Sequence, residues 1–325
     1  MKVIVIGLGS MGKRRIRLMK QFDSAIQIIG VDSNKERAES AASEYSIQYA
    51  LSIDDALGNG EVTCAFVCTA PLSHHTIIED LLSRNLHVFT EINLISDGYQ
   101  NIIETATRKN KVLFLSSTFL YRKDIQYIIE QVKSQKVNYI YHTGQYLPDW
   151  HPWENYKNFF VGDKRTNGCR EIFAIELPWI VKCFGQIKNI EVIKDRMTLL
   201  DICYPDNYML LVEHEGGTKG QIAVDIIARK AIRRLEVFNE KLHIFWDGTP
   251  QSLSQLNIEN KELMNISTYN VVHKDNRYSE NIIENAYMDE IVAFFEEVEH
   301  GNTEYKYHNF EKDWEIIRLI DQIEK

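Results

Sequence analysis

The chain has 325 residues, of which 44% are hydrophobic and 26% charged, which is ordinary usage for a globular protein. This length predicts two domains, and the 6 prolines and 16 glycines exclude a fibrous or low-complexity chain. The net charge of −9 argues against a nucleic-acid-coating protein, which needs a basic excess for phosphate contacts, and against a polybasic membrane binder. We therefore expect no nucleic-acid partner.

The cysteines number five, an odd count at scattered spacings that includes no Cys-x-x-Cys pair. This pattern favours reduced thiols over a disulfide framework or a zinc ribbon, so we expect no metal. The apolar run Val3–Ile6 is too short for a signal peptide, and no stretch approaches the ~18 apolar residues of a membrane-spanning helix. The sequence thus predicts a cytoplasmic protein with no membrane partner.

The first third of the chain alternates short apolar runs with helical patterns. Continuous apolar strands separated by helices are typical of a parallel sheet covered on both faces, so we predict a doubly wound α/β (Rossmann) domain over residues 1–118. Its predicted strands are Val3–Ile6, Ile26–Val31, Cys64–Cys68, Leu86–Thr90 and Val112–Leu115. Its predicted helices are Met11–Gln21, Asn34–Glu44, Ser73–Arg84 and Ser96–Lys109.

The pattern changes near Thr118, where strand-like runs with little helix between them begin to dominate. This predicts an antiparallel or mixed sheet in an α+β domain over residues 119–325. Its predicted strands are Val137–Tyr146, Ile187–Thr198, Tyr208–Glu213, Lys219–Ile227, Arg234–Phe238, Leu242–Trp246 and Ser252–Ile258. Its predicted helices are Arg122–Ser134, Gly168–Phe184, Ile282–Glu299 and Phe310–Ile323.

The most informative motif is Gly7-Leu8-Gly9-Ser10-Met11-Gly12, which follows an apolar strand and precedes a helix. In this context Gly7 permits a tight turn, Gly9 lets a pyrophosphate approach the backbone, and Gly12 lets the helix pack against the strand. The free N–H groups of the helix N-terminus would then face the phosphates. The motif therefore predicts a dinucleotide site.

An acidic residue, Asp32, ends the second predicted strand. A carboxylate there can accept hydrogen bonds from both hydroxyls of an adenine ribose and would repel a 2′-phosphate, so NAD is favoured over NADP. Lys35 and Arg37 follow, and they either admit NADP or form a solvated helix face. The first helix carries a basic cluster that either attracts the diphosphate of the cofactor or forms a solvated helix face. The cluster consists of Lys13, Arg14, Arg15, Arg17 and Lys20.

Two further polar segments, Cys68–His74 and Thr90–Asn93, lie at the ends of predicted strands. We expect both at the carboxyl edge of the sheet, where ligands bind in such folds. With the glycine motif and Asp32, the Pro71-x-x-His74 pattern and the position of Glu91 resemble the glucose–fructose oxidoreductase / inositol dehydrogenase / MocA family. Similar stretches continue almost to the end of the chain, namely Arg234–Phe238, Trp246–Pro250 and Glu290–Phe295.

This resemblance implies NAD(P)-dependent oxidation or reduction of a sugar, polyol or nucleotide-sugar-like compound. It also implies a second domain with a large open, mostly antiparallel sheet that serves substrate binding and oligomerisation, in a homodimer or homotetramer whose sheets pack face to face. The cofactor-binding residues that it implies are Gly7, Gly9, Ser10, Met11, Gly12, Asp32, Thr69, His74 and Glu91.

The usual catalytic lysine and histidine of that family are absent, because Ile92 and Ile175 stand in their places. Hydride transfer at an alcohol carbon needs a group that handles the hydroxyl proton, and isoleucine cannot do so. We expect their replacements in the aromatic and polar segment 146–156, among Lys164, Arg165 and Asn167, or at the start of the helix that begins at Gly168, which points at the nicotinamide in the family. The catalytic candidates are His151, Tyr156, Lys164, Arg170 and Glu171, and the substrate-binding candidates are Trp150, His151, Trp153, Tyr156, Arg165 and Glu176.

Several interpretations stay open at this point. Arg170 and Glu171 could form a buried ion pair that holds the loop instead of acting in catalysis. The leading hypothesis is an NAD-dependent oxidoreductase of carbohydrate metabolism. One alternative is a catalytically silent relative that binds NAD or a sugar as a sensor or assembly partner, and the two isoleucines favour it. Another is chemistry that avoids the lysine and histidine, such as reduction of an imine or a C=C bond.

Overall fold

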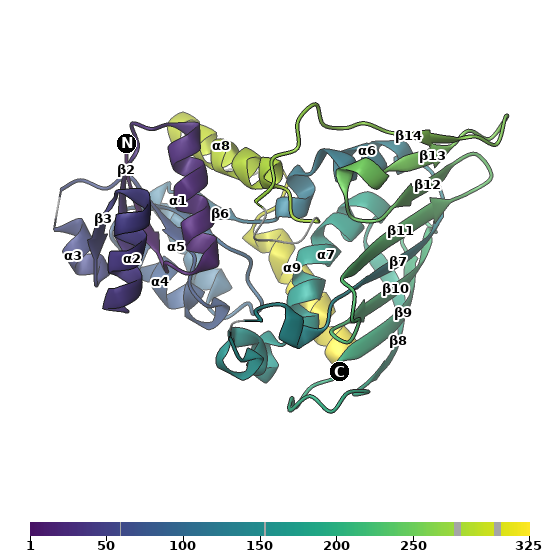
Figure 1. Cartoon of the computed structure of the whole chain (residues 1–325), viewed down its shortest axis with the longest axis horizontal. Coiled ribbons are helices and arrows are strands. Elements are labelled where there is room, and N and C mark those ends of the chain that lie inside the picture. Colours follow the sequence, from purple (N-terminus) through teal and green to yellow (C-terminus); the bar gives the residue numbers. More distant parts are fainter. Residues whose placement is uncertain (59, 153, 276–280, 302–306) are drawn as a thin grey trace. The chain divides into compact units, whose positions relative to one another are not determined.

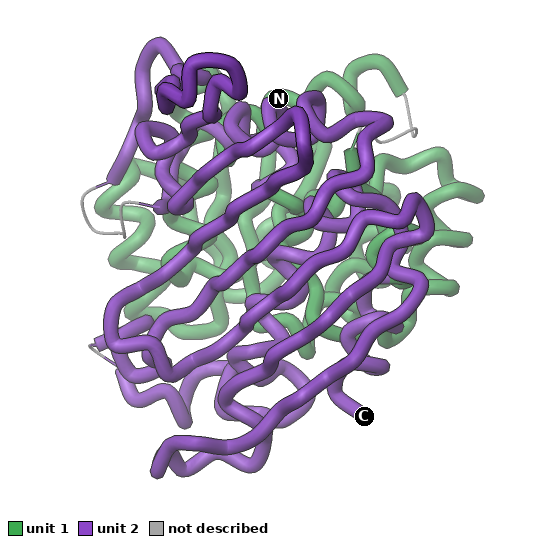
Figure 2. Tube along the Cα trace, turned by 90° about the vertical axis from the view of Figure 1, so that its right-hand side faces the viewer, with its two compact units in different colours: residues 1–118, 287–315 green, residues 119–286, 316–325 purple. Residues whose placement is uncertain are grey.

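The computed structural model describes residues 1–58, 60–152, 154–275, 281–301 and 307–325. The chain divides into two compact units (Figure 2). Unit 1 comprises Met1–Thr118 and Tyr287–Glu315, and unit 2 comprises Phe119–Ala286 and Ile316–Lys325. The domains predicted from the sequence, 1–118 and 119–325, differ from these units in the assignment of residues 287–315.

Unit 1 is built on a six-stranded parallel sheet in the order β3-β2-β1-β4-β5-β6 (Figure 1). Most residues of its central strands are buried, as expected for strands that are covered on both faces. The strands are β1 (Lys2–Ile6), β2 (Gln27–Val31), β3 (Gln48–Ala50), β4 (Cys64–Val67), β5 (His87–Thr90) and β6 (Leu113–Leu115). The helices are α1 (Ser10–Phe22), α2 (Lys35–Tyr45), α3 (Ile53–Leu57), α4 (His74–Ser83) and α5 (Tyr99–Lys109).

The C-terminal segment of unit 1 contributes most of α8 (Glu284–His300) to this core. The ring of Phe294 packs edge-on against Phe66, Phe89 and Phe114, at centroid distances of 5.2, 5.6 and 5.8 Å. These three rings come from β4, β5 and β6 in turn. The helix therefore buries apolar surface of a sheet whose strands all lie in the first third of the chain.

Unit 2 holds an eight-stranded sheet in the order β14-β13-β12-β11-β7-β10-β9-β8. The β7–β10 pair is parallel and the other pairs are antiparallel. The strands are β7 (Asn138–Gly144), β8 (Ile187–Asp195), β9 (Asn207–His214), β10 (Lys219–Asp225), β11 (Ile232–Phe238), β12 (His243–Trp246), β13 (Ser254–Leu256) and β14 (Leu263–Asn265). The other helices of the chain are α6 (Lys123–Val132), α7 (Gly168–Phe184) and α9 (Phe310–Glu324), and 3₁₀ turns lie at Pro71–Ser73, Thr118–Tyr121, Leu147–Asp149, Tyr156–Asn158, Phe160–Gly162, Lys164–Thr166 and Pro250–Ser252.

One face of the unit 2 sheet packs against α6 and α7 (Figure 1). Trp179 of α7 is fully buried there and meets Trp246 of β12 at 6.3 Å between ring centroids. Figure 2 shows the strands of unit 2 side by side, with no other described element of that unit in front of them. Large apolar side chains are exposed on this open face, among them Ile193, Met209 and Leu211.

The predicted fold class is confirmed, since a doubly wound parallel sheet is followed by a large, mostly antiparallel one. Most predicted elements agree with the structure to within a few residues at each end, whereas β3, α3 and β14 were not predicted. These elements have three to five residues, too few for a periodic pattern to develop. Within the described ranges, no helix combines the length and apolar character needed to cross a membrane.

Candidate functional site

The glycine motif forms the turn between β1 and α1 in unit 1. Gly7 has φ +88°, and a Cβ there would lie 2.7 Å from the carbonyl oxygen of Cys68, so the turn requires glycine. A Cβ on Gly12 would lie 2.0 Å from the carbonyl oxygen of Gly7. By contrast, a Cβ on Gly9 would have no described atom within 4 Å. Internal packing thus leaves room at Gly9, which fits a site for a pyrophosphate at the start of the helix.

Asp32 follows β2 and links that strand to the glycine turn. Its carboxylate accepts hydrogen bonds from the backbone N–H groups of Leu8 and Asn34, both at 2.9 Å. Arg37 of α2 donates to the same carboxylate at 2.8 and 3.2 Å. Burial alone would raise the pKa of Asp32, but these hydrogen bonds outweigh burial and hold the pKa below its ordinary value. Asp32 is therefore ionised at neutral pH.

His74 opens α4 and is 2% exposed, with both ring nitrogens in contact with protein atoms. Its Nε2 lies 2.9 Å from the carbonyl oxygen of Thr69, and since a carbonyl can only accept, Nε2 carries the hydrogen. Its Nδ1 lies 2.6 Å from the side-chain oxygen of Asn93. Burial lowers the pKa of His74, although the contacts with Thr69 and Asn93 act in the opposite direction. The ring thereby fixes the backbone at Thr69.

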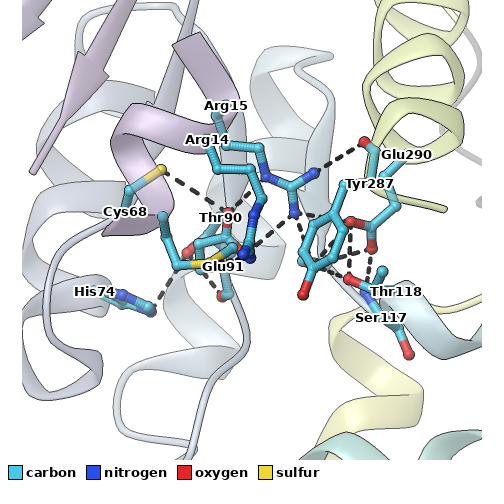
Figure 3. Close-up of polar contacts among 12 residues, drawn as sticks. Arg14, Arg15, Cys68, His74, Thr90, Glu91, Ser117, Thr118, Tyr287 and Glu290 are labelled. Carbon is cyan, nitrogen blue, oxygen red and sulfur yellow. Dashed lines mark hydrogen bonds and ion pairs between the residues drawn. The ribbon is translucent and has the colours of Figure 1, made fainter. Parts of the chain in front are cut away.

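Arg15 of α1 is fully buried at the centre of a polar cluster in unit 1 (Figure 3). Its guanidinium donates to Glu91 at 2.7 and 3.2 Å and to Glu290 at 2.7 Å. Burial alone would lower the pKa of Arg15, but the two carboxylates outweigh this effect and raise it. The solvated face considered for the first helix is therefore wrong for Arg14 and Arg15, which are 4% and 0% exposed.

Glu290 of α8 also holds the end of the first segment of unit 1. Its carboxylate accepts from Ser116 Oγ at 2.9 Å, from Ser117 N at 2.7 Å and from Thr118 Oγ1 at 3.1 Å. Burial raises the pKa of Glu290, and Arg15 acts against that rise. Since the carboxylate of Glu91 is engaged with Arg15, its contact with a cofactor stays a prediction.

In unit 2, the start of α7 places Glu171 at a half-buried position. The side chain of Asn167 caps the helix by accepting from the backbone N–H of Arg170 at 2.8 Å. Glu171 follows in the first turn, and its Oε2 is buried without a hydrogen-bond partner in the described chain. Burial raises the pKa of Glu171 to about 8, so this carboxyl is largely protonated at pH 7.

Two neighbouring candidates, Arg170 and Glu176, form ion pairs with other residues of unit 2. Arg170 donates to Asp321 at 2.6 Å and also to Glu324, so the alternative of an ion pair between Arg170 and Glu171 is wrong. Glu176 is 1% exposed, and its carboxylate accepts hydrogen bonds from three side chains. These donors are Tyr141 at 2.6 Å, Trp179 at 2.7 Å and Arg233 at 2.7 Å.

The remaining candidates of unit 2 lie before α7. His151 Nδ1 is 4.0 Å from Glu154, and burial lowers the pKa of His151 while Glu154 acts in the opposite direction. The hydroxyl of Tyr156 accepts from the backbone N–H of Asp201 at 3.1 Å. Trp150 donates from Nε1 to the carbonyl oxygen of Gln145 at 2.9 Å. Lys164 and Arg165 are exposed in a 3₁₀ turn, and Trp153 lies outside the described residues.

The structure thus brings the glycine turn, Asp32 and the Cys68–Thr69 segment together at the carboxyl edge of the unit 1 sheet. Sequence reasoning did not predict Asn93 or Glu290 as site residues, and it considered Arg15 only as one member of a basic cluster that could attract the diphosphate. Asn93 and Glu290 lie in segments that resemble the family, but their partners in space could not be read from the chain. No three His, Cys, Asp or Glu side chains gather as metal ligands would among the described residues.

This unit has the architecture of a nucleotide-binding oxidoreductase domain, and comparison with protein families agrees. Residues 1–117 match the model described as "Oxidoreductase family, NAD-binding Rossmann fold". This model is that of the glucose–fructose oxidoreductase / inositol dehydrogenase / MocA family, and the match covers most of unit 1. The family resemblance predicted from the sequence is thereby confirmed over residues 1–117, and NAD, the predicted cofactor, is the one that this family model describes.

Curated relatives match part of the chain. Biliverdin reductase A of Mus musculus is 29% identical over 192 residues, which span 58% of this chain and 59% of that protein. Inositol 2-dehydrogenase of Arthrobacter sp. (strain FB24) is 33% identical over 100 residues, 30% of each chain. The stretch matched to the biliverdin reductases therefore spans less than two thirds of their length.

Solved structures match the whole fold at low sequence identity. UDP-N-acetylglucosamine 3-dehydrogenase GnnA from Acidithiobacillus ferrooxidans has a TM-score of 0.77 and 15% identity, with 100% of this chain and 96% of that chain covered. Levoglucosan dehydrogenase in complex with NADH and L-sorbose has a TM-score of 0.78 and 14% identity, with 99% and 95% covered. At such identities the likeness shows the fold.

Proposed function

We propose that this protein is an NAD-dependent oxidoreductase that transfers a hydride between the cofactor and a sugar, polyol or nucleotide-sugar-like substrate. Its family and the glycine turn with Asp32 support the cofactor part of this proposal. The substrate part is supported by the inositol dehydrogenase relative and by neighbours whose names give nucleotide-sugar and sugar substrates. The likeness of these neighbours extends over both units.

The observation that carries the proposal is the state of Glu171. In the family, a lysine and a histidine stand where this chain has Ile92 and Ile175. Among the catalytic candidates, Glu171 combines a buried, unpartnered carboxyl oxygen with a pKa raised by burial to about 8. Arg170 is held by two carboxylates instead. A carboxyl with a pKa near the working pH is suited to general acid–base catalysis.

Glu171 is the proton-transfer group in this proposal. Bound NADH supplies the hydride for reduction of a carbonyl carbon. The protonated carboxyl of Glu171 gives its proton to the carbonyl oxygen, which becomes a hydroxyl, and Glu171 is left as a carboxylate. In the direction of oxidation the carboxylate takes the hydroxyl proton. Asp32 and the glycine turn bind and orient the nucleotide.

The variant Glu171→Gln tests this assignment. We expect kcat for carbonyl reduction to fall about 10²- to 10⁴-fold, with the KM for NADH unchanged, because glutamine cannot donate the proton. In the native protein, reduction should slow as pH rises through about 8, since Glu171 ionises there. The measurement is NADH consumption against a panel of sugars and nucleotide sugars between pH 6 and 9.

Glu154→Gln, which removes an exposed carboxylate from the neighbouring segment, is the control and should keep native rates. Full turnover by Glu171→Gln would contradict the role of this residue. Binding of NADH without turnover of any substrate would instead favour the catalytically silent alternative.

A second candidate is reduction of a conjugated double bond. It is favoured by the 29% identity to biliverdin reductase A, because biliverdin is a linear tetrapyrrole with conjugated double bonds. Such a reaction involves no alcohol oxygen, so it does not require the lysine and histidine that are usual in the family. The presence of Ile92 and Ile175 in their places is consistent with it. Biliverdin belongs in the same NADH-consumption panel, and turnover of biliverdin without turnover of any sugar would decide for this candidate.

A further inference from the structure

The carboxylate of Asp32 is fully occupied by the protein itself. Leu8 N and Arg37 Nε donate to Oδ2 at 2.9 and 2.8 Å. Asn34 N and an Arg37 terminal nitrogen donate to Oδ1 at 2.9 and 3.2 Å. Two donors on each oxygen use the acceptor capacity of a carboxylate. A ribose hydroxyl can therefore bind Asp32 only if one of these donors leaves.

Arg37 is the donor that is able to leave. Its side chain is 50% exposed, whereas that of Asp32 is 6% exposed, so the guanidinium covers the carboxylate from the solvent side. The other two donors are backbone groups of the glycine turn and of the start of α2. Because solvent screens the exposed guanidinium of Arg37, we expect moving it aside to cost no more than about five-fold in affinity.

The same pair changes how the site meets a phosphorylated ribose. Asp32 alone would repel a 2′-phosphate. With Arg37 in place the carboxylate is neutralised, and the second terminal nitrogen of Arg37 has no partner in the described chain. A guanidinium can bridge a carboxylate and a phosphate because its N–H groups form a planar fork.

We propose that Arg37 is a specificity-determining residue that lets this site accept NADP(H) as well as NAD(H). It binds Asp32 and the 2′-phosphate when NADP(H) enters, and it turns away from Asp32 when the ribose carries hydroxyls. This role of Arg37 goes beyond the solvated helix face that the sequence offered as one alternative for this residue. It rests on the proposed dinucleotide site, and it does not depend on the substrate or on Glu171.

The test is direct titration of the full chain with NADH and with NADPH, followed by nicotinamide fluorescence at low salt. We expect the native protein to bind both. In Arg37→Gln, the Kd for NADPH should rise at least ten-fold. The Kd for NADH should stay the same or fall by up to five-fold, because Arg37 no longer competes with the ribose hydroxyls for Asp32. Arg37→Lys should be intermediate, since an ammonium attracts phosphate but cannot form the fork.

Lys35→Gln is the matched control. Lys35 lies on the same turn of α2, is 67% exposed and pairs weakly with Glu39 at 3.7 Å, so its loss should leave both affinities within two-fold. The inference is overturned if the native protein binds NADH and does not bind NADPH, or if Arg37→Gln leaves the ratio of the two Kd values unchanged. Failure to bind either nucleotide would instead overturn the dinucleotide site itself.

Discussion

Arg15 is the centre of a cluster of buried charges in unit 1. Its guanidinium meets Glu91 and Glu290, and it also lies 4.5 Å from the centroid of the Phe89 ring. Removing one member of a buried charge group leaves its partners uncompensated out of water, whereas an exposed pair contributes little. Arg15 therefore acts on stability.

We expect Arg15→Met to destabilise the protein by about 3–5 kcal/mol, because Glu91 and Glu290 would remain buried without their common partner. The measurement is urea unfolding followed by circular dichroism. Lys13→Met is the control on the same helix, since Lys13 pairs with Glu44 at the surface and should cost less than about 1 kcal/mol. Equal losses in the two variants would count against the buried cluster.

At the scale of elements, the glycines in the turn from β1 to α1 have two different roles, one in backbone packing and one in ligand binding. Gly7 and Gly12 are required by the protein's own backbone, because a Cβ at either position would collide with a carbonyl oxygen at 2.7 or 2.0 Å. Gly9 is not required in this way. Packing and ligand binding therefore make separate demands on one short motif.

This difference predicts opposite behaviour of two single-methyl substitutions. Gly12→Ala should destabilise by about 1–3 kcal/mol, since α1 must move away from β1. Gly9→Ala should change stability by less than about 1 kcal/mol but raise the Kd for NADH at least ten-fold, because the methyl group would occupy the space of the pyrophosphate. Thermal unfolding and NADH fluorescence are the two measurements. Tight NADH binding by Gly9→Ala would refute the phosphate role of this turn.

The elements were largely predictable because their signals are local. The apolar pattern gives α7 the same bounds, Gly168–Phe184, as the structure does. The site was predictable only in part. Arg15 looked like one of several basic residues on a helix, because its partners Glu91 and Glu290 lie 76 and 275 positions away. A sequence pattern carries no information on such pairs until the fold is known.

At the scale of the whole molecule, the open face of the unit 2 sheet is the feature without an intramolecular explanation. Ile140, Ile193, Met209 and Leu211 expose 44, 75, 55 and 57% of their surface on it. Contiguous apolar surface of this kind marks interaction sites. The homodimer or homotetramer expected from the family resemblance would cover it with a second copy of the same sheet.

We therefore expect a native mass of at least twice 37.9 kDa by light scattering coupled to size exclusion. Leu211→Asp should shift the protein toward 37.9 kDa, because a carboxylate would be desolvated in a sheet-to-sheet contact. Leu51→Asp, on an exposed position of unit 1, serves as the comparison and should leave the mass unchanged. A native protein that is monomeric at micromolar concentration would contradict the expectation.

The return of residues 287–315 to unit 1 has a consequence for biosynthesis. When the first 118 residues have left the ribosome, Phe66, Phe89 and Phe114 still lack the ring of Phe294, and Arg15 still lacks the carboxylate of Glu290. Both arrive only after some 170 further residues have been made, at roughly 5–20 residues per second. The nucleotide-binding unit is thus begun before unit 2 and completed only after most of unit 2 has been made, and over that interval its aromatic rings lack the cover that α8 gives them in the folded unit.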